Sequence, residues 1–240
     1  MSEFQTKLHS VPSGGFLTDR DKDKKPILDV RELGIDFGGL TAVDGFNLMI
    51  GRNEITGLIG PNGAGKTTVF NLLTKVYQPT HGTILLNGKD IHDLNTAQVN
   101  RAGIARTFQN IRLFGELSVE ENITVAMDTQ MHYTMPEGIF RLPRFWKEER
   151  IVHERAMELL SIFHMEDLAK AKASSLPYGA QRRLEILRAL ATNPSLLLLD
   201  EPAAGMNPSE TAELMENIRS IRDTFKIAVL LIEHDMNLVM

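Results

Sequence analysis

The chain has 240 residues, 42% of them hydrophobic, which suffices for one large domain or two small ones with a core that needs no covalent staples. Its 26 basic and 31 acidic residues give a formal charge of −5 without a dense basic block, which argues against nucleic acid as the main partner. Cysteine is absent, so disulfides, thiolate metal sites and cysteine nucleophiles are excluded, and a reducing compartment such as the cytoplasm is expected.

The chain is expected to begin with a flexible tail over residues 1–25. This segment is polar, contains Ser13-Gly14-Gly15 and a charged run over 19–25, and lacks the apolar centre of a signal peptide. Residues 26–240 are expected to form the folded part of the protein.

The first part of the folded region has β-like texture. Short apolar and β-branched runs, separated by glycine-rich turns, predict strands at 27–36, 43–50, 54–59 and 83–86. A glycine loop and a predicted helix over 66–75 follow the third strand, and Asn87-Gly88 predicts a tight turn after the fourth. Strand, glycine loop and helix in this order begin a nucleotide-binding α/β unit.

The middle of the chain, about 111–176, is predicted to be a helical insertion. Apolar residues recur there at helical spacing, and β-branched runs are scarce. Within it, a long irregular connection is expected over 127–147, where Pro136, Gly138 and Pro143 interrupt the pattern.

The α/β texture then returns. We expect helices at 181–192 and 208–223 and strands at 196–200 and 227–232. Strands so uniformly apolar are normally covered on both faces of a sheet. No stretch reaches the roughly 20 apolar residues needed to cross a bilayer, so at a membrane other subunits would do the spanning.

A phosphate-binding loop is predicted between a strand and a helix. Its residues are Gly60, Pro61, Asn62, Gly63, Ala64, Gly65, Lys66, Thr67 and Thr68, which match G-x-x-x-x-G-K-[ST]. The glycines let backbone N–H groups surround phosphate oxygens at a helix N-terminus. Lys66 is expected to reach the β- and γ-phosphates of ATP, and the Thr67 hydroxyl to bind Mg²⁺. This context argues against a simple glycine turn.

Two carboxylates follow the apolar strand expected at 196–200. Asp200 at its tip is placed to hold Mg²⁺ through water, and Glu201 is the natural base to activate an attacking water. The alternative is a buried strand followed by a solvated acidic turn. The phosphate-binding loop in the same chain favours the catalytic interpretation.

Residues 176–181, L-P-Y-G-A-Q, precede a predicted helix and resemble the L-S-G-G-Q signature of the ABC ATPase family. The leucine and the second glycine agree, Gln181 is taken as the glutamine, and Pro177 and Tyr178 replace the serine and the first glycine. The resemblance implies contacts to the γ-phosphate of an opposing subunit from Pro177, Tyr178, Gly179 and Gln181. Taken alone, the segment would pass for a helix cap.

Further family positions appear in order. Gln109, in R-T-F-Q, falls at the family's Q-loop, which senses Mg²⁺ and touches the membrane subunits; alone it would be a surface glutamine. His234 falls at the switch histidine that senses the γ-phosphate; alone it would be an ordinary loop residue. Phe37 matches the aromatic residue that stacks on adenine, with packing in the core as the rival interpretation. Asn207 stands where the family's D-loop usually has Asp.

Within this family, four segments look like the ATPase of high-affinity branched-chain amino-acid uptake systems. They lie at 37–40, 106–109, 178–186 and 200–205. The resemblance implies an ATP-hydrolysing subunit that powers the import of branched-chain amino acids. The runner-up is a urea or short-chain amide importer, followed by an ABC ATPase that acts on DNA or ribosomes and by a module that binds ATP without turnover.

The expected fold is therefore α/β, a P-loop NTPase core of the ABC ATPase type with an antiparallel β subdomain and a helical insertion. The implied partners are transmembrane permease subunits, a second ABC ATPase of the same or a related chain, and indirectly a periplasmic binding protein. The implied location is peripheral, on the cytoplasmic face of the inner membrane. Family members usually continue beyond the switch histidine with more strands and a helix, so a chain truncated at the C-terminus is expected.

Overall fold

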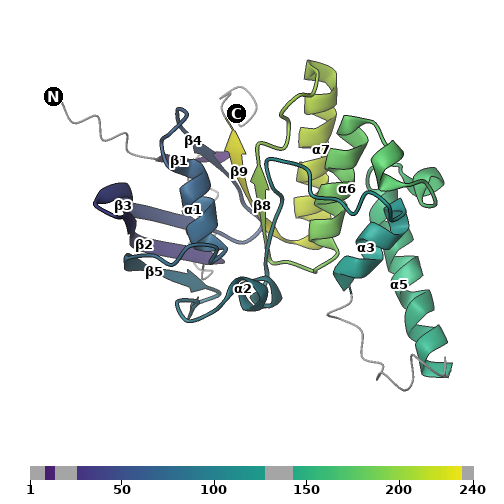
Figure 1. The fold of residues 1–240 in the computed structure, drawn as a ribbon, viewed down its shortest axis with the longest axis horizontal. Coiled ribbons are helices and arrows are strands. Elements are labelled where there is room, and N and C mark those ends of the chain that lie inside the picture. The colour runs from purple at the N-terminus through teal and green to yellow at the C-terminus, as the bar shows by residue number, and fades with distance from the viewer. Residues whose placement is uncertain (1–8, 14–25, 128–142, 234–240) are drawn as a thin grey trace. The chain divides into compact units, whose positions relative to one another are not determined.

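The structure, a computed structural model, describes residues 9–13, 26–127 and 143–233 (Figure 1). The chain divides into two compact units, one formed by 1–109 with 194–240 and the other by 110–193. Among the described helices, none combines the length and apolarity that a membrane span requires.

The first unit contains a five-stranded sheet in the order β1-β4-β9-β8-β7. Strands β4 (Ile55–Ile59), β9 (Ala228–Glu233), β8 (Leu196–Asp200) and β7 (Ile104–Arg106) run parallel to one another. The four leucines of β8 are completely buried, as expected for a parallel strand covered on both faces. Parallel strands end at the same edge, so the segments after β8 and β7 leave the sheet side by side.

Within the segment expected to be a flexible tail over 1–25, residues 9–13 form strand β1 (His9–Ser13). It pairs antiparallel with β4 at the edge of the sheet, with His9 opposite Ile59 and Ser13 opposite Ile55. Pairing there satisfies backbone groups of β4 that would otherwise form an open edge. Proline at position 12 is compatible with an edge strand, which needs no second hydrogen-bonded neighbour.

The first unit also contains the expected antiparallel sheet, in the order β3-β2-β5-β6. Its strands are β3 (Leu40–Ile50), β2 (Leu28–Phe37), β5 (His81–Leu86) and β6 (Lys89–Asp90). The predicted turn between the last two is present, with Asn87 and Gly88 both at positive φ, as a type I′ hairpin requires.

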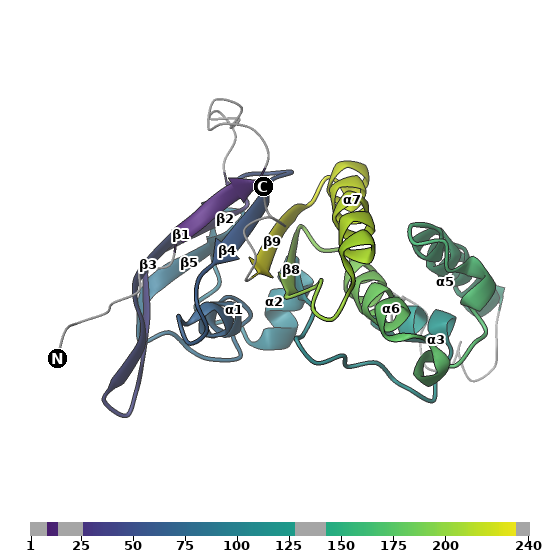
Figure 2. The ribbon, with the colours of Figure 1, turned by 90° about the horizontal axis from the view of Figure 1, so that it is seen from above.

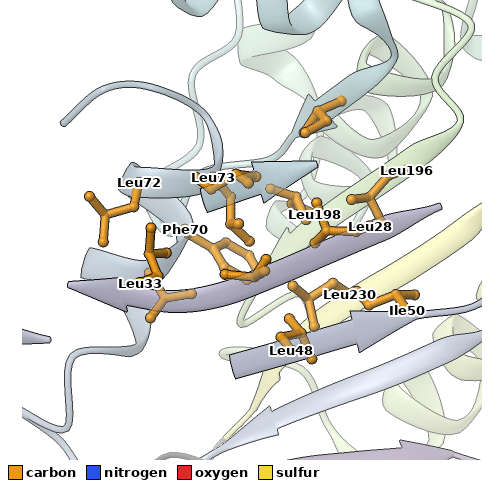
Figure 3. Packing of buried hydrophobic residues seen from close by; sticks show 14 of the residues in the cluster. Leu28, Leu33, Leu48, Ile50, Phe70, Leu72, Leu73, Leu196, Leu198 and Leu230 are labelled. Carbon is orange, nitrogen blue, oxygen red and sulfur yellow. The ribbon is translucent and has the colours of Figure 1, made fainter. Parts of the chain in front are cut away.

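One apolar core joins both sheets of the first unit to α1 (Lys66–Leu73) (Figures 1 and 2). Phe70 and Leu73 of this helix lie among Leu28 of the antiparallel sheet and Leu198 of the parallel sheet (Figure 3). All four side chains are completely buried. This packing fixes the direction of α1 and therefore the position of the loop that precedes it.

Two further helices belong to the first unit, α2 (Thr96–Ala102) and α7 (Pro208–Phe225). Asn207 caps α7 by accepting a hydrogen bond of 2.9 Å from the backbone N–H of Glu210, whose carboxylate accepts one of 3.0 Å from the Asn207 N–H. Aspartate and asparagine are both good caps, so replacing the family's Asp by Asn207 preserves this start of the helix.

The second unit is helical, built from α3 (Val119–Met127), α5 (Pro143–Ser161) and α6 (Tyr178–Leu190), with 3₁₀ turns at Glu166–Leu168 and Ala173–Ser175. Each α-helix contacts the other two. Helix α5 begins within the segment expected to be irregular, because proline is well tolerated in the first turn of a helix. The unit continues through Asn193, so the helix expected after the insertion is part of it.

Candidate active site

The phosphate-binding loop connects β4 to α1 in the first unit. Gly63 and Gly65 take φ values of 81° and 83°, in the left-handed region that favours glycine. A Cβ on Gly65 would lie 2.9 Å from the carbonyl oxygen of Ala42, so the backbone passes too close for any side chain. Helix α1 has no side-chain cap on its N-terminal N–H groups. An uncapped N-terminus after a glycine turn fits the phosphates of a nucleotide.

Lys66 lies folded over this loop. Its ammonium group donates hydrogen bonds to the carbonyl oxygens of Gly60, at 2.6 Å, and Pro61, at 2.9 Å. The residue is buried, with 5% of its surface exposed. An ammonium group has three N–H donors, so Lys66 can keep these contacts and still bind a phosphate oxygen. The adjacent Thr67 is exposed, so its hydroxyl is accessible.

The two predicted carboxylates lie at the carboxyl end of β8. Asp200 is buried, with 1% of its surface exposed, and its Oδ2 accepts a hydrogen bond of 2.8 Å from Arg106. Glu201 adopts a φ of 48°, unusual for a residue with a side chain, while its N–H donates to the carbonyl oxygen of Ile232 at 3.1 Å. Backbone strain of this kind is concentrated at functional sites.

Gln109 reaches the same place from the segment after β7. Its Nε2 donates a hydrogen bond of 3.2 Å to Oε2 of Glu201. The structure thus brings together two of the predicted catalytic residues. Gln109, Thr67 and Asp200 offer amide, hydroxyl and carboxylate oxygens, a donor set that suits Mg²⁺.

The sequence analysis assigned no function to two charged residues near this site. Arg106 binds Asp200. In the sequence it could be noticed only as a basic residue, because the strand that it ends is too short to be predicted. Glu233, the last residue of β9, is buried, and its Oε1 lies 3.4 Å from the backbone nitrogen of Ala203 as a hydrogen-bond acceptor. A carboxylate that ends an apolar strand is the pattern that identified Asp200, and it was equally visible here.

Phe37 is the last residue of β2, and 44% of its surface is exposed. Its ring contacts the ring of Tyr77 edge-on, with the centroids 5.3 Å apart. Phe37 is therefore not a core residue, and part of its side chain is open to solvent. Its stacking on adenine stays a prediction.

The signature segment belongs to the second unit. Pro177 is the N-cap residue of α6 and offers no side-chain hydrogen bond to it. The side-chain amide of Gln181 donates to the carbonyl oxygen of Leu176 at 2.9 Å, closing its own turn. Counted from Leu176, the fifth position of the pattern is Ala180, so the alignment of Gln181 with the signature glutamine requires correction by one residue. Tyr178 is exposed and Gly179 half-buried.

The predicted switch residue, His234, lies outside the described residues, which end with β9. Its proposed contact with the γ-phosphate stays a prediction.

The sequence profile of the family described as ABC transporter matches residues 43–204. The chain therefore belongs to the ABC transporter family, and its fold is that of an ABC ATPase. It is 48% identical over 216 residues to the high-affinity branched-chain amino acid transport ATP-binding protein BraF of Pseudomonas aeruginosa, covering 90% of the chain and 85% of that relative. LivG of Escherichia coli K12, described in the same words, gives the same identity and coverage.

Solved structures give the same family. The chain matches a crystal structure of the ADP conformation of an ATP-binding cassette of an ABC transporter with a TM-score of 0.76 and 30% identity. The match covers 90% of this chain and 84% of that one. The expected P-loop core with an antiparallel β subdomain and helical insertion is confirmed.

Proposed function

We propose that this chain is the ATP-hydrolysing subunit that powers the import of branched-chain amino acids through an ABC transporter. The hydrogen bond between Gln109 and Glu201, beside a phosphate-binding loop, carries the assignment of hydrolysis. A site that only binds nucleotide needs no such carboxylate. The choice of solute rests on the 48% identity to BraF and LivG, because the ATPase subunit has no contact with the solute.

Nucleotide binding is assigned to the loop and the start of α1. Backbone N–H groups of 60–68 surround the β- and γ-phosphates, and the Lys66 ammonium neutralises part of their charge. Phe37 stacks on adenine. Thr67, Gln109 and Asp200, the last through water, would hold Mg²⁺, which neutralises phosphate charge when bound.

Hydrolysis is assigned to Glu201. Its carboxylate accepts a proton from the attacking water, and the Gln109 amide holds that carboxylate in place. His234 would donate a hydrogen bond to the γ-phosphate. Because these groups come from different segments, small movements of the Q-loop alter the position of the base.

The assembly follows from the family. Two ATPase subunits, identical or related, enclose two ATP molecules, each site using the loop of one chain and the signature segment of the other. The pair attaches to permease subunits at the cytoplasmic face of the inner membrane, and a periplasmic binding protein delivers the solute. Closure of the pair moves the permease between its two states.

The test is reconstitution in proteoliposomes with the permease subunits encoded beside this chain and their binding protein. We expect ATP-dependent uptake of radiolabelled leucine, none with Glu201→Gln, and none of urea. Uptake of urea but not leucine would replace the solute while keeping the ATPase assignment. Absence of ATP hydrolysis by the intact complex would overturn the assignment itself.

A further inference from the structure

Arg106 is a buried cation that connects three elements of the first unit. From the end of β7, its Nη2 donates to Oδ2 of Asp200, the last residue of β8, at 2.8 Å, and its Nη1 donates to Oδ1 of Asn71, in α1, at 2.6 Å. The exposed fractions of the side chains are 7% for Arg106 and 2% for Asp200. One guanidinium group therefore bridges the proposed metal carboxylate and the helix that begins at the phosphate-binding loop.

Aromatic rings hold the guanidinium group in place. Its central carbon lies 5.5 Å from the ring centroid of Phe70 and 5.2 Å from that of Phe108. Its Nε atom is buried and has no hydrogen-bond partner in the described part of the chain. These contacts restrain Arg106 in an orientation in which its planar fork spans two acceptors at once. A lysine ammonium carries its donors on one atom and lacks the planar fork that here spans Asp200 and Asn71.

Asp200 depends on this contact. A carboxylate removed from water is strongly unfavourable unless a countercharge and hydrogen bonds accompany it. Arg106 is the one cation within 4.0 Å of Asp200 among the described residues. It therefore holds the carboxylate at a fixed orientation, and through Asn71 it ties that orientation to α1.

We propose that Arg106 is the positioning residue of the Mg²⁺ site: it aligns Asp200 with the phosphate-binding helix before metal and nucleotide arrive. This inference rests on the proposed nucleotide site and adds a residue to it. Arg106 acts through Asp200 and touches neither nucleotide nor metal. Partners that orient a metal ligand in this way typically contribute a factor of about 10 to 100 in metal affinity.

The test measures nucleotide binding and not only turnover. Calorimetry gives the affinity of the purified chain for a non-hydrolysable ATP analogue, first in EDTA and then across a Mg²⁺ titration. The variants are Arg106→Gln, Arg106→Lys and Asn71→Ala, with Arg101→Gln on the exposed side of α2 as the matched control. Thermal unfolding of each variant establishes that it is folded.

We expect Arg106→Gln to raise the Mg²⁺ concentration at the midpoint of the titration by about tenfold or more. The affinity for the ATP analogue in EDTA should change less than about twofold. Arg106→Lys and Asn71→Ala should give smaller shifts in the same direction, and Arg101→Gln none. Should Arg106→Gln not fold, the other two variants carry the test.

Two results overturn the proposal. If the Mg²⁺ midpoint is unchanged in every folded variant, the bridge is a structural ion pair. If affinity falls equally with and without Mg²⁺, Arg106 supports the loop and not the metal site. Failure of the parent chain to bind nucleotide more tightly with Mg²⁺ is a different outcome, because it contradicts the proposed Mg²⁺ site itself.

Discussion

The side-chain amide of Gln109 donates a hydrogen bond of 3.2 Å to the carboxylate of Glu201, although 92 positions separate them in the chain. The contact arises because β7 and β8 are parallel neighbours, with Arg106 opposite Leu198, so both strands end at one edge. The amide restricts the orientation of the proposed base. Any movement of the Q-loop is thereby transmitted to the carboxylate that we propose activates water.

Replacing Glu201 with glutamine should leave nucleotide binding intact and stop turnover, because an amide cannot accept the proton of the attacking water. The expected result is steady-state ATPase activity at background and an ATP-stabilised dimer on a sizing column. Glu216→Gln, on the exposed side of α7, is a control with the same chemistry and should hydrolyse ATP normally. Normal hydrolysis by Glu201→Gln would remove Glu201 from the role of base.

Lys66→Ala should abolish ATP binding. The ammonium group is expected to neutralise part of the charge of the β- and γ-phosphates, and it is bound to the Gly60 and Pro61 carbonyls, so its loss should remove the ligand contact and loosen the loop. Each hydrogen bond to a charged group contributes about 1.5 to 3 kcal/mol. Calorimetry should detect no binding, whereas Lys89→Ala on the exposed β6 should bind as the parent does. Unchanged affinity of Lys66→Ala contradicts the assignment of the loop.

Phe37→Ala should weaken ATP binding by about 1 to 3 kcal/mol, the range for stacking of a base on an aromatic side chain. Leu40 lies across the same hairpin and is 70% exposed, so Leu40→Ala controls for a general loss of apolar surface and should leave affinity unchanged. The measurement is the dissociation constant for ATP by calorimetry. If Phe37→Ala and Leu40→Ala both bind ATP as tightly as the parent chain does, Phe37 does not contact adenine.

Pro177→Ser should strengthen the ATP-dependent dimer. Proline gives neither a hydroxyl nor an N–H to an opposing γ-phosphate, whereas serine at this N-cap position supplies a hydroxyl. In a Glu201→Gln background with saturating Mg-ATP, the dimer dissociation constant should fall about tenfold or more, which corresponds to about 1.4 kcal/mol per decade.

The measurement is sedimentation equilibrium, with Pro177→Ala as the control that lacks a hydroxyl. Equal dimerisation of the serine and alanine variants would mean that the hydroxyl does not meet the opposing nucleotide. The partial match to the family signature would then have no role in dimerisation.

The stability of the helical unit should depend on pH through Glu120. Burial by itself raises the pKa of this carboxyl, but the hydrogen bonds of 2.6 Å that it accepts from Lys170 and His153 outweigh this effect, and the pKa lies below its ordinary value of 4.5. The stabilisation is therefore present above the unfolded pKa and is lost as pH falls through the lower folded pKa. Glu121 is the other charged group beside the cluster.

Thermal unfolding followed by circular dichroism from pH 3 to pH 8 measures this effect. Glu120→Gln should unfold at a lower temperature than the parent at pH 7, and the difference should shrink toward pH 3. The loss should be modest, because Lys170 and His153 are largely exposed and water screens them. Glu158→Gln, which breaks an exposed pair with Arg155, should have little effect at any pH. A difference that does not depend on pH would assign Glu120 a packing role only.

The sequence by itself determined the phosphate-binding loop and the two carboxylates at the end of β8. These features are local. A glycine turn between a strand and a helix fixes its own backbone geometry, as the φ of Gly65 shows, and four leucines before Asp200 specify a buried strand that must end in a polar group at the sheet edge. Hydrophobic spacing likewise indicated that the segment at about 111–176 is largely helical.

Only the tertiary structure decided which residues meet at the site. The sheet order β1-β4-β9-β8-β7 does not follow the chain, so no local pattern places Gln109 against Glu201 or Arg106 between Asp200 and Asn71. For the same reason, no local pattern in the sequence predicts the pairing of β1 with β4. Propensity describes one segment at a time, whereas strand order is set by how all the apolar faces are buried together, and the charged groups are brought into contact by that order.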